Sequence, residues 1–167
     1  MTTSRNSLIV TIASESDRPV LERLWTMFRH DMSTFTDALP DEHGRFRQER
    51  LDAALSNPRW AAFVFRVGTA TVGFAVVRGL DAGTRVISSF FIARGGRRSG
   101  LGRAAVEYVT ALYPGRWSVA FQDGNTTASL FWSTVAANAD EHWVLDHQPV
   151  PGRPELPPDA WIHFTAG

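Results

Sequence analysis

The sequence predicts a mixed α/β fold with a mostly antiparallel central sheet of six to seven strands and about four helices on its two faces. Three short apolar runs follow one another through glycine-containing turns over residues 60–93, which is typical of an antiparallel meander. A strand–helix–strand–helix order over residues 86–137 then predicts one parallel pair of strands. Because 167 residues with 44% hydrophobic content form one core, we expect a single domain over 1–167.

The first part of the chain predicts one edge strand and two helices. Residues 8–13 are rich in β-branched side chains, which favours a strand at the edge of the sheet. Apolar residues at helical spacing predict a first helix that begins near Pro19 and ends with His30 and Asp31. A second helix is expected over about 42–55, after a turn-rich segment.

The rest of the chain predicts strands and helices with short connections. Residues 60–67 are almost wholly apolar, which indicates a strand buried on both faces. Strands over 86–93 and 117–122 flank a helix over 100–112, and we expect these two strands to be parallel. The other expected elements are a strand over 71–78, a helix over 125–137, and final strands over 143–147 and 161–165.

Composition excludes several classes of function. The 17 basic residues are all arginine and are balanced by 17 acidic ones, so no net field draws the chain to nucleic acid or to membranes. The absence of cysteine excludes disulfides, thiolate zinc sites and a cysteine nucleophile. The histidines share no ligand spacing, so no metal is expected. The chain has no apolar run of transmembrane length and no secretory leader, which favours a cytoplasmic location. We expect a monomer or a homodimer.

The most informative motif is the loop Arg97-Arg98-Ser99-Gly100-Leu101-Gly102, which follows an apolar strand and opens a helix. The first turn of a helix leaves its backbone N–H groups unpaired, and the aligned peptide dipoles make that end partly positive. Glycines let the backbone lie close to a ligand, and arginines supply bidentate charge. The N–H groups of residues 98–103, together with Arg97 and Arg98, are therefore predicted to bind a diphosphate.

Two other nucleotide-binding motifs fit less well. The phosphate-binding loop of ATPases and GTPases requires Gly-Lys-Ser/Thr, and this chain has no lysine. The dinucleotide-binding motif requires a third glycine where Ala105 stands, and an acidic residue roughly twenty positions further on. Asp123 lies near that spacing, so the dinucleotide motif fails only in part.

The pattern Arg-x-x-Gly-x-Gly after an apolar strand resembles the acetyl-coenzyme A signature of the Gcn5-related N-acetyltransferase superfamily. The resemblance includes the aliphatic Ile92, Asn125 at the start of the next helix, and the aromatic pair that ends in Trp132. It covers residues 86 to about 132. It implies the fold of that superfamily, in which the two parallel strands splay apart at a β-bulge, with acetyl-coenzyme A as the co-substrate.

The resemblance also implies which residues contact the coenzyme. The backbone N–H of Phe91 or Ile92 is the candidate for polarising the thioester carbonyl, as an oxyanion hole does. The implied coenzyme-binding residues are Phe90, Phe91, Ile92, Arg97, Arg98, Ser99, Gly100, Leu101, Gly102, Arg103, Asn125 and Trp132. Asn125 is also expected to cap its helix.

Trp132 departs from the superfamily, which often has tyrosine there as the proton donor to the departing thiolate. An indole N–H does not ionise usefully, and a thiol with a pKa of about 8.5 leaves tolerably as an anion. Trp132 then packs either against the coenzyme arm or in the core with Phe131. Water, a hydroxyl of Ser88, Ser89 or Ser129, or no side chain protonates the sulfur.

His30 and Asp31 are the first candidates for handling the acceptor amine. In the superfamily the loop between the first two helices borders the acceptor site. Asp31 would then hold the acceptor ammonium and His30, which titrates near neutrality, would accept its proton. A solvated helix end is the structural alternative, and other candidates for the base are His142, His147 and Asp123.

The sequence therefore predicts an N-acetyltransferase that moves the acetyl group of acetyl-coenzyme A to a primary amine by direct attack in a ternary complex. The acceptor is a small-molecule amine or a peptide amine. One alternative is a non-catalytic module that binds coenzyme A or a partner through the same fold. Another is a regulator that binds ATP or NAD.

Overall fold

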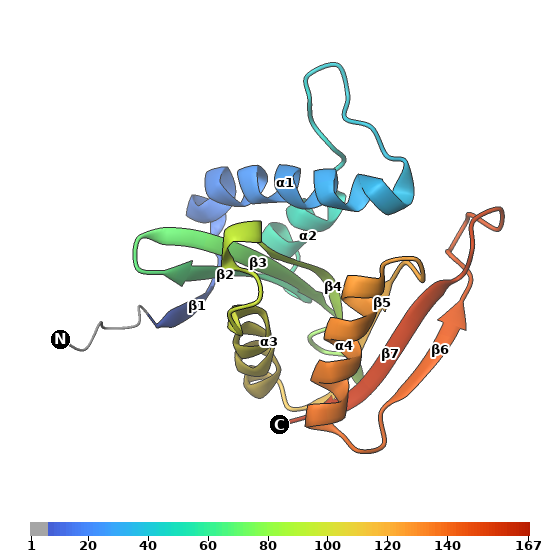
Figure 1. The fold of residues 1–167 in the computed structure, drawn as a ribbon. Helices are drawn as coiled ribbons and strands as arrows, with labels where there is room; N and C mark the ends of the chain where they lie inside the picture. The colour runs from blue at the N-terminus through green and yellow to red at the C-terminus, as the bar shows by residue number, and fades with distance from the viewer. Residues whose placement is uncertain (1–6) are drawn as a thin grey trace.

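The computed structural model describes residues 7–167, which form one seven-stranded sheet in the order β1-β2-β3-β4-β5-β7-β6 (Figure 1). Every neighbouring pair is antiparallel except β4 and β5, which are parallel. The strands are β1 (Leu8–Ile12), β2 (Trp60–Val67), β3 (Ala70–Arg78), β4 (Thr84–Ile92), β5 (Gly115–Phe121), β6 (Val144–Gln148) and β7 (Asp159–Ala166). The predicted fold class is confirmed, and β1 lies at an edge as expected.

Helices cover both faces of this sheet. The described residues form four α-helices: α1 (Arg18–Thr36), α2 (Glu49–Ser56), α3 (Leu101–Leu112) and α4 (Thr126–Ala139). Figure 1 shows α1 and α2 on one face and α3 and α4 on the other. None of the helices in residues 7–167 combines the length and the apolar character that a membrane span requires.

Each face of the sheet has its own apolar core, and β2 contributes to both. Val64 packs with Leu21 and Leu51 on the side that we call the α1–α2 face. Phe63 and Phe65 point to the opposite side, where α3 and α4 pack. All the residues from Ala61 to Phe65 are buried, so the expectation of a strand covered on both faces is confirmed.

The expected end of the first helix and the expected start of the second helix were wrong. α1 continues to Thr36, so His30 and Asp31 lie inside its C-terminal part and do not end it. It ends where Asp37 adopts a left-handed conformation (φ 54°) and donates its N–H to the carbonyl of Ser33. Tertiary packing explains the extra length, because Met32 packs against the apolar cluster beneath α1.

The second helix begins at Glu49, later than expected. The segment before it is a loop, because the side chain of Asp41 accepts hydrogen bonds from the N–H groups of His43 and Arg45. These bonds compete with helical ones, and Gly44 between them has φ +72°. The hydrogen bonds that Asp41 accepts therefore prevent the residues just after it from forming the expected helix.

The two parallel strands separate beyond their fourth pair. β4 pairs with β5 from Thr84↔Arg116 to Ile87↔Val119, and no further. On its other edge β4 contains a bulge, because Val76 pairs with Ser89 and Val77 with Ile87. Ser88 is therefore the extra residue of a β-bulge in β4, which bends that strand away from β5. We call residues 88–92 of β4 and 120–121 of β5, which do not pair with each other, the splay.

Candidate functional site

Backbone groups of β4 are directed into the splay. The N–H of Ala93 donates to the carbonyl of Val72 at 2.7 Å, so Ala93 bonds to β3. Because backbone direction alternates along an antiparallel strand, Phe91 also bonds to β3, whereas Phe90 and Ile92 present their N–H groups to the splay. Of the two expected donors to a thioester oxygen, strand alternation therefore favours Ile92 over Phe91.

Two buried polar side-chain atoms come from the strands that border the splay. Ser89 is 4% exposed, and its Oγ has no hydrogen-bond partner among residues 7–167. The Oε1 atom of Gln122, the residue after β5, is also buried without a partner in that part of the chain. Buried polar atoms are nearly always paired, so these two fit a site that a polar ligand completes.

The loop that leads into α3 presents a row of free N–H groups, which we call the cradle (residues 98–103). The first N–H that returns to the helix is that of Ala104, which donates to the carbonyl of Gly100 at 3.1 Å. The N–H groups of residues 98–103 donate to no protein acceptor within the described residues. Arg98 (φ 60°) and Gly100 (φ 82°) both have left-handed conformations, which turn successive N–H groups outward.

The two glycines of the motif have different structural roles. At Gly100 a side chain would meet no atom within 4 Å, so its positive φ is the reason for glycine there and the space beside it is open. At Gly102 a Cβ atom would lie 3.2 Å from the ring of Phe131. Gly102 therefore lets α3 approach α4 closely, whereas the motif alone suggested that it makes room for a ligand.

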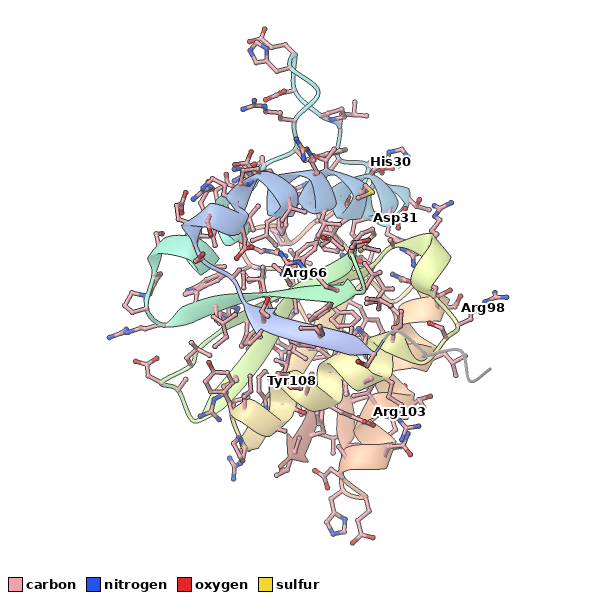
Figure 2. All side chains as sticks on the ribbon, turned by 90° about the vertical axis from the view of Figure 1, so that its left-hand side faces the viewer. His30, Asp31, Arg66, Arg98, Arg103 and Tyr108 are labelled. Atoms are coloured by element: carbon pink, nitrogen blue, oxygen red, sulfur yellow. The ribbon has the colours of Figure 1, made fainter. Side chains whose placement is uncertain are left out.

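The arginines around the cradle are divided between two directions. Arg98 points away from the body of the protein and Arg103 lies further along α3 (Figure 2). The Nε atom of Arg103 lies 2.8 Å from Glu107. Arg97 turns back instead: its Nε donates to the carbonyl of Ile92 at 2.7 Å, and its guanidinium lies 5.6 Å from the ring centre of Phe91.

Asp31 is held by two arginines. Its Oδ2 atom lies 2.6 Å from Nη2 of Arg97, and its Oδ1 atom 3.0 Å from Nη2 of Arg94. Partial burial would raise the pKa of Asp31, but the hydrogen bonds and charges of Arg97 and Arg94 outweigh it and hold the pKa below its usual value. A carboxylate in this state is a weak base.

His30 is not near the splay. It is exposed, and Figure 2 shows it on the side of α1 turned away from the sheet, whereas Asp31 lies on the side that faces the loop before α3. Adjacent positions of a helix point in directions about 100° apart, so one of the two residues can face the loop while the other faces solvent. The structure therefore does not direct the side chains of His30 and Asp31 toward one common site.

Asn125 and Trp132 lie where α4 meets the splay. The Oδ1 atom of Asn125 accepts the N–H of Ala128 at 3.0 Å, so the expected helix cap is confirmed. Trp132 is 5% exposed, and its ring centre lies 4.8 Å from that of Phe131 and 5.3 Å from that of Phe90, both edge to face. The ring of Trp132 thus packs in the core with Phe131, which is one of the two expected arrangements.

Neither tyrosine replaces the missing proton donor. Tyr108 is exposed on α3 (Figure 2). Tyr113 follows the last residue of α3, and its ring centre lies 6.5 Å from that of Phe63. Among residues 7–167, no three His, Asp or Glu side chains come together as metal ligands would.

Sequence reasoning missed several polar residues of the α1–α2 face. Arg50, at the start of α2, donates from Nη1 to the carbonyl of Ser88, the extra residue of the bulge, at 3.2 Å. On the same face, Nδ1 of His163 lies 2.7 Å from Oγ of Ser118, and Nε2 lies 3.2 Å from Asp146. The alternation of apolar and polar residues along β7 is the signal that could have placed His163 there.

Of the two other histidines expected as candidates for the base, only His147 is placed on the opposite side of the sheet. Nε2 of His147 lies 3.0 Å from Asp123, which follows β5. His147 pairs with Ala160, a residue of the core under α4, so it lies on the α3–α4 side of the sheet. His142 is exposed in the turn before β6 and lies near Glu141.

Comparisons with known proteins point to one family. The model of the acetyltransferase (GNAT) family matches residues 21–142. An acetyltransferase from Thermus thermophilus has a TM-score of 0.69 and 19% identity, over 96% of this chain and 99% of that one. The PaiA N-acetyltransferase from Thermoplasma acidophilum, solved in complex with coenzyme A, has a TM-score of 0.67 and 11% identity, over 95% and 99%.

A third similar structure is the ribosomal-protein-S18-alanine N-acetyltransferase from Escherichia coli, with a TM-score of 0.64 and 10% identity, over 96% of this chain and 95% of that one. A search of curated proteins finds no match to the sequence. At these identities the structural likeness establishes the fold alone.

Proposed function

Since the chain belongs to the acetyltransferase (GNAT) family, we propose that it transfers the acetyl group of acetyl-coenzyme A to a primary amine. The single observation that carries the proposal is the cradle, whose unpaired N–H groups lead from the splay into the first turn of α3. A helix start with free N–H groups binds phosphate groups well. A donor whose thioester arm lies in the splay and whose diphosphate lies on the cradle would occupy both features at once.

In this proposal the donor lies along β4. The N–H groups of residues 98–103 and the side chain of Arg98 bind the diphosphate. The pantetheine arm pairs with the backbone of Phe90 and Ile92, as an added strand would, because β5 leaves these groups free. Ser99, Gly100, Leu101, Gly102 and Arg103 contribute through these N–H groups, whereas the side chain of Arg97 is held by Asp31.

The reaction then proceeds by direct attack. The lone pair of a neutral amine attacks the thioester carbon, a C–N bond forms, and the carbonyl electrons move onto oxygen, where the N–H of Ile92 stabilises them. When the carbonyl re-forms, the C–S bond breaks and coenzyme A leaves as a thiolate, which needs no side-chain acid. The chain has no cysteine to form an acyl-enzyme through a thiol.

His30 and Asp31 have no role in proton transfer here. His30 faces away from the sheet, and Asp31 is neutralised by Arg94 and Arg97. Asp31 instead holds Arg97 in place between α1 and β4. The amine proton passes to solvent, and the Ser89 hydroxyl, buried beside the splay without a partner in residues 7–167, is available to the departing sulfur.

The proposal is tested by the release of free thiol from acetyl-coenzyme A with a panel of primary amines, together with calorimetry of coenzyme A binding. We expect saturable binding of coenzyme A and amine-dependent thiol release. Tight binding without turnover on any amine would instead identify a non-catalytic coenzyme-binding module. Preferential binding of ATP or NAD would overturn the assignment of the cradle.

A further inference from the structure

Arg50 has an unusual position for an exposed arginine. α2 packs on β2 and β3, yet the side chain of Arg50 extends past β3 to the carbonyl of Ser88 in β4. Ser88 is the bulge residue directly after the last β4–β5 pair, so the guanidinium lies where the splay begins, on the α1–α2 face. One carbonyl satisfies one of its five N–H donors.

Two arginines and two acids surround Arg50. Desolvation by surrounding protein lowers its pKa, and the charges of Arg29 and Arg78 lower it further, while those of Asp159 and Glu49 act in the opposite direction. Arg50 is nevertheless accessible to solvent. A cation that is accessible but surrounded by protein and by other cations is a favourable site for an anion.

The nearby charges are not balanced by ion pairs. Among residues 7–167, no carboxylate lies within 4 Å of a side-chain nitrogen of Arg29, Arg50 or Arg78. The Nε atom of Arg29 on α1 is buried without a hydrogen-bond partner in that part of the chain. Of the two nearby acids, Glu49 pairs with Arg47, and burial raises the pKa of Asp159 at the start of β7.

From this arrangement, and resting on the proposed function, we propose that the acceptor is a small amine that also carries a carboxylate, and that Arg50 binds this carboxylate beside the splay. The planar guanidinium matches a carboxylate with two parallel hydrogen bonds. The positive charges of Arg50 and of Arg29, unpaired within residues 7–167, also favour the neutral form of the amine, which is the form that attacks. A polycationic acceptor would be repelled by the same charges.

The test compares α-amino acids with their carboxamides, which keep the side chain and remove the negative charge. The amide leaves the amine at least as nucleophilic at neutral pH, so a preference for the acid reports recognition of the carboxylate. We expect kcat/KM for the acids to exceed that for the amides by about tenfold or more. Equal values, or a preference for the amides, would overturn the proposal.

Variants assign the preference to Arg50. In Arg50→Gln the acid-to-amide ratio should fall to about one, while the Kd of coenzyme A stays within about threefold of the parent value. Arg50→Lys keeps the charge without the bidentate geometry and should give an intermediate ratio. Arg59→Gln is the matched control, because Arg59 is an exposed arginine that pairs with Asp81. An unchanged ratio in Arg50→Gln would contradict the role of Arg50.

A binding measurement separates this inference from the proposed function. Calorimetry of an amino acid and its amide against the protein loaded with coenzyme A involves no acetyl transfer. Here too we expect about tenfold tighter binding of the acid, lost in Arg50→Gln. If coenzyme A itself fails to bind, the proposed function fails; if coenzyme A binds and the acid has no advantage, only the carboxylate assignment fails.

Discussion

Asp31 on α1 lies 2.6 Å from Nη2 of Arg97, in the segment between β4 and α3, and so joins two parts of the chain that are 66 residues apart. The same carboxylate also bonds Arg94. Arg97 in turn donates to the carbonyl of Ile92. The ion pair therefore connects α1 to the strand that borders the splay.

Asp31→Asn should reduce the free energy of unfolding by about 0.5–1 kcal/mol near neutral pH, because it removes the charge from a pair that is partly accessible to solvent. The folded-state pKa of Asp31 lies below its unfolded value of about 3.9. Its contribution is therefore complete above that pH and is lost as the pH falls through the folded pKa. Urea unfolding of both proteins at pH 7, 5 and 3 measures this, and a difference that stays constant from pH 7 to pH 3 would contradict the ion pair.

Gly100→Asp should weaken the binding of coenzyme A by at least tenfold relative to Gly100→Asn. Asn and Asp both tolerate a left-handed backbone, so the two variants share the same strain and differ only in charge. The carboxylate would occupy the open space beside Gly100, where we place the diphosphate. Calorimetry gives both affinities.

Gly44→Asp is the control for this pair, because Gly44 also has a positive φ (+72°) and open space at its Cβ, but lies in the loop before α2. It should leave the affinity for coenzyme A unchanged. Equal affinities of Gly100→Asp and Gly100→Asn would show that no anion binds at the cradle.

Trp132→Phe should raise KM for acetyl-coenzyme A while kcat falls by less than about threefold, because the ring packs and donates no proton. The smaller ring leaves space between Phe90 and Phe131, so the free energy of unfolding should fall by about 1–2 kcal/mol. Steady-state kinetics and chemical unfolding measure the two effects. A large fall in kcat with unchanged stability would mean that the indole takes part in the reaction.

Asn125→Ala should cost about 1 kcal/mol of stability, because it removes the bond from the N–H of Ala128 that caps α4. Asn125→Ser retains an N-cap side chain and should recover most of that loss. If Asn125 is only a cap, the Ser variant will also bind coenzyme A as the parent does. Weak binding by a fully stable Ser variant would place the amide beside the coenzyme.

Much of the site could be predicted because its parts are close together in the chain. The arginine–glycine loop, the strand before it and the helix after it are consecutive, so composition and spacing identify them. The cap by Asn125 is likewise a contact between residues three positions apart. The resemblance to the acetyltransferase superfamily implied a β-bulge where the parallel strands splay apart, and Ser88 is that bulge.

The errors came where distant contacts decide local structure. Helical spacing alone could not show that α1 continues to Thr36, because the helix is extended by packing against the sheet. The different directions of His30 and Asp31 could not be predicted from the sequence either, because the packing of α1 on the sheet decides which side of the helix is covered.

The sequence by itself determined the order of the elements, the residues of the cradle and the family, because each depends on neighbours along the chain. The tertiary structure decided that Asp31 pairs with Arg97, and that Nη1 of Arg50 lies 3.2 Å from the carbonyl of Ser88, 38 residues away. Such pairs depend on which strands adjoin and where they separate. The energies that settle these choices are summed over the whole fold, so no local pattern records them.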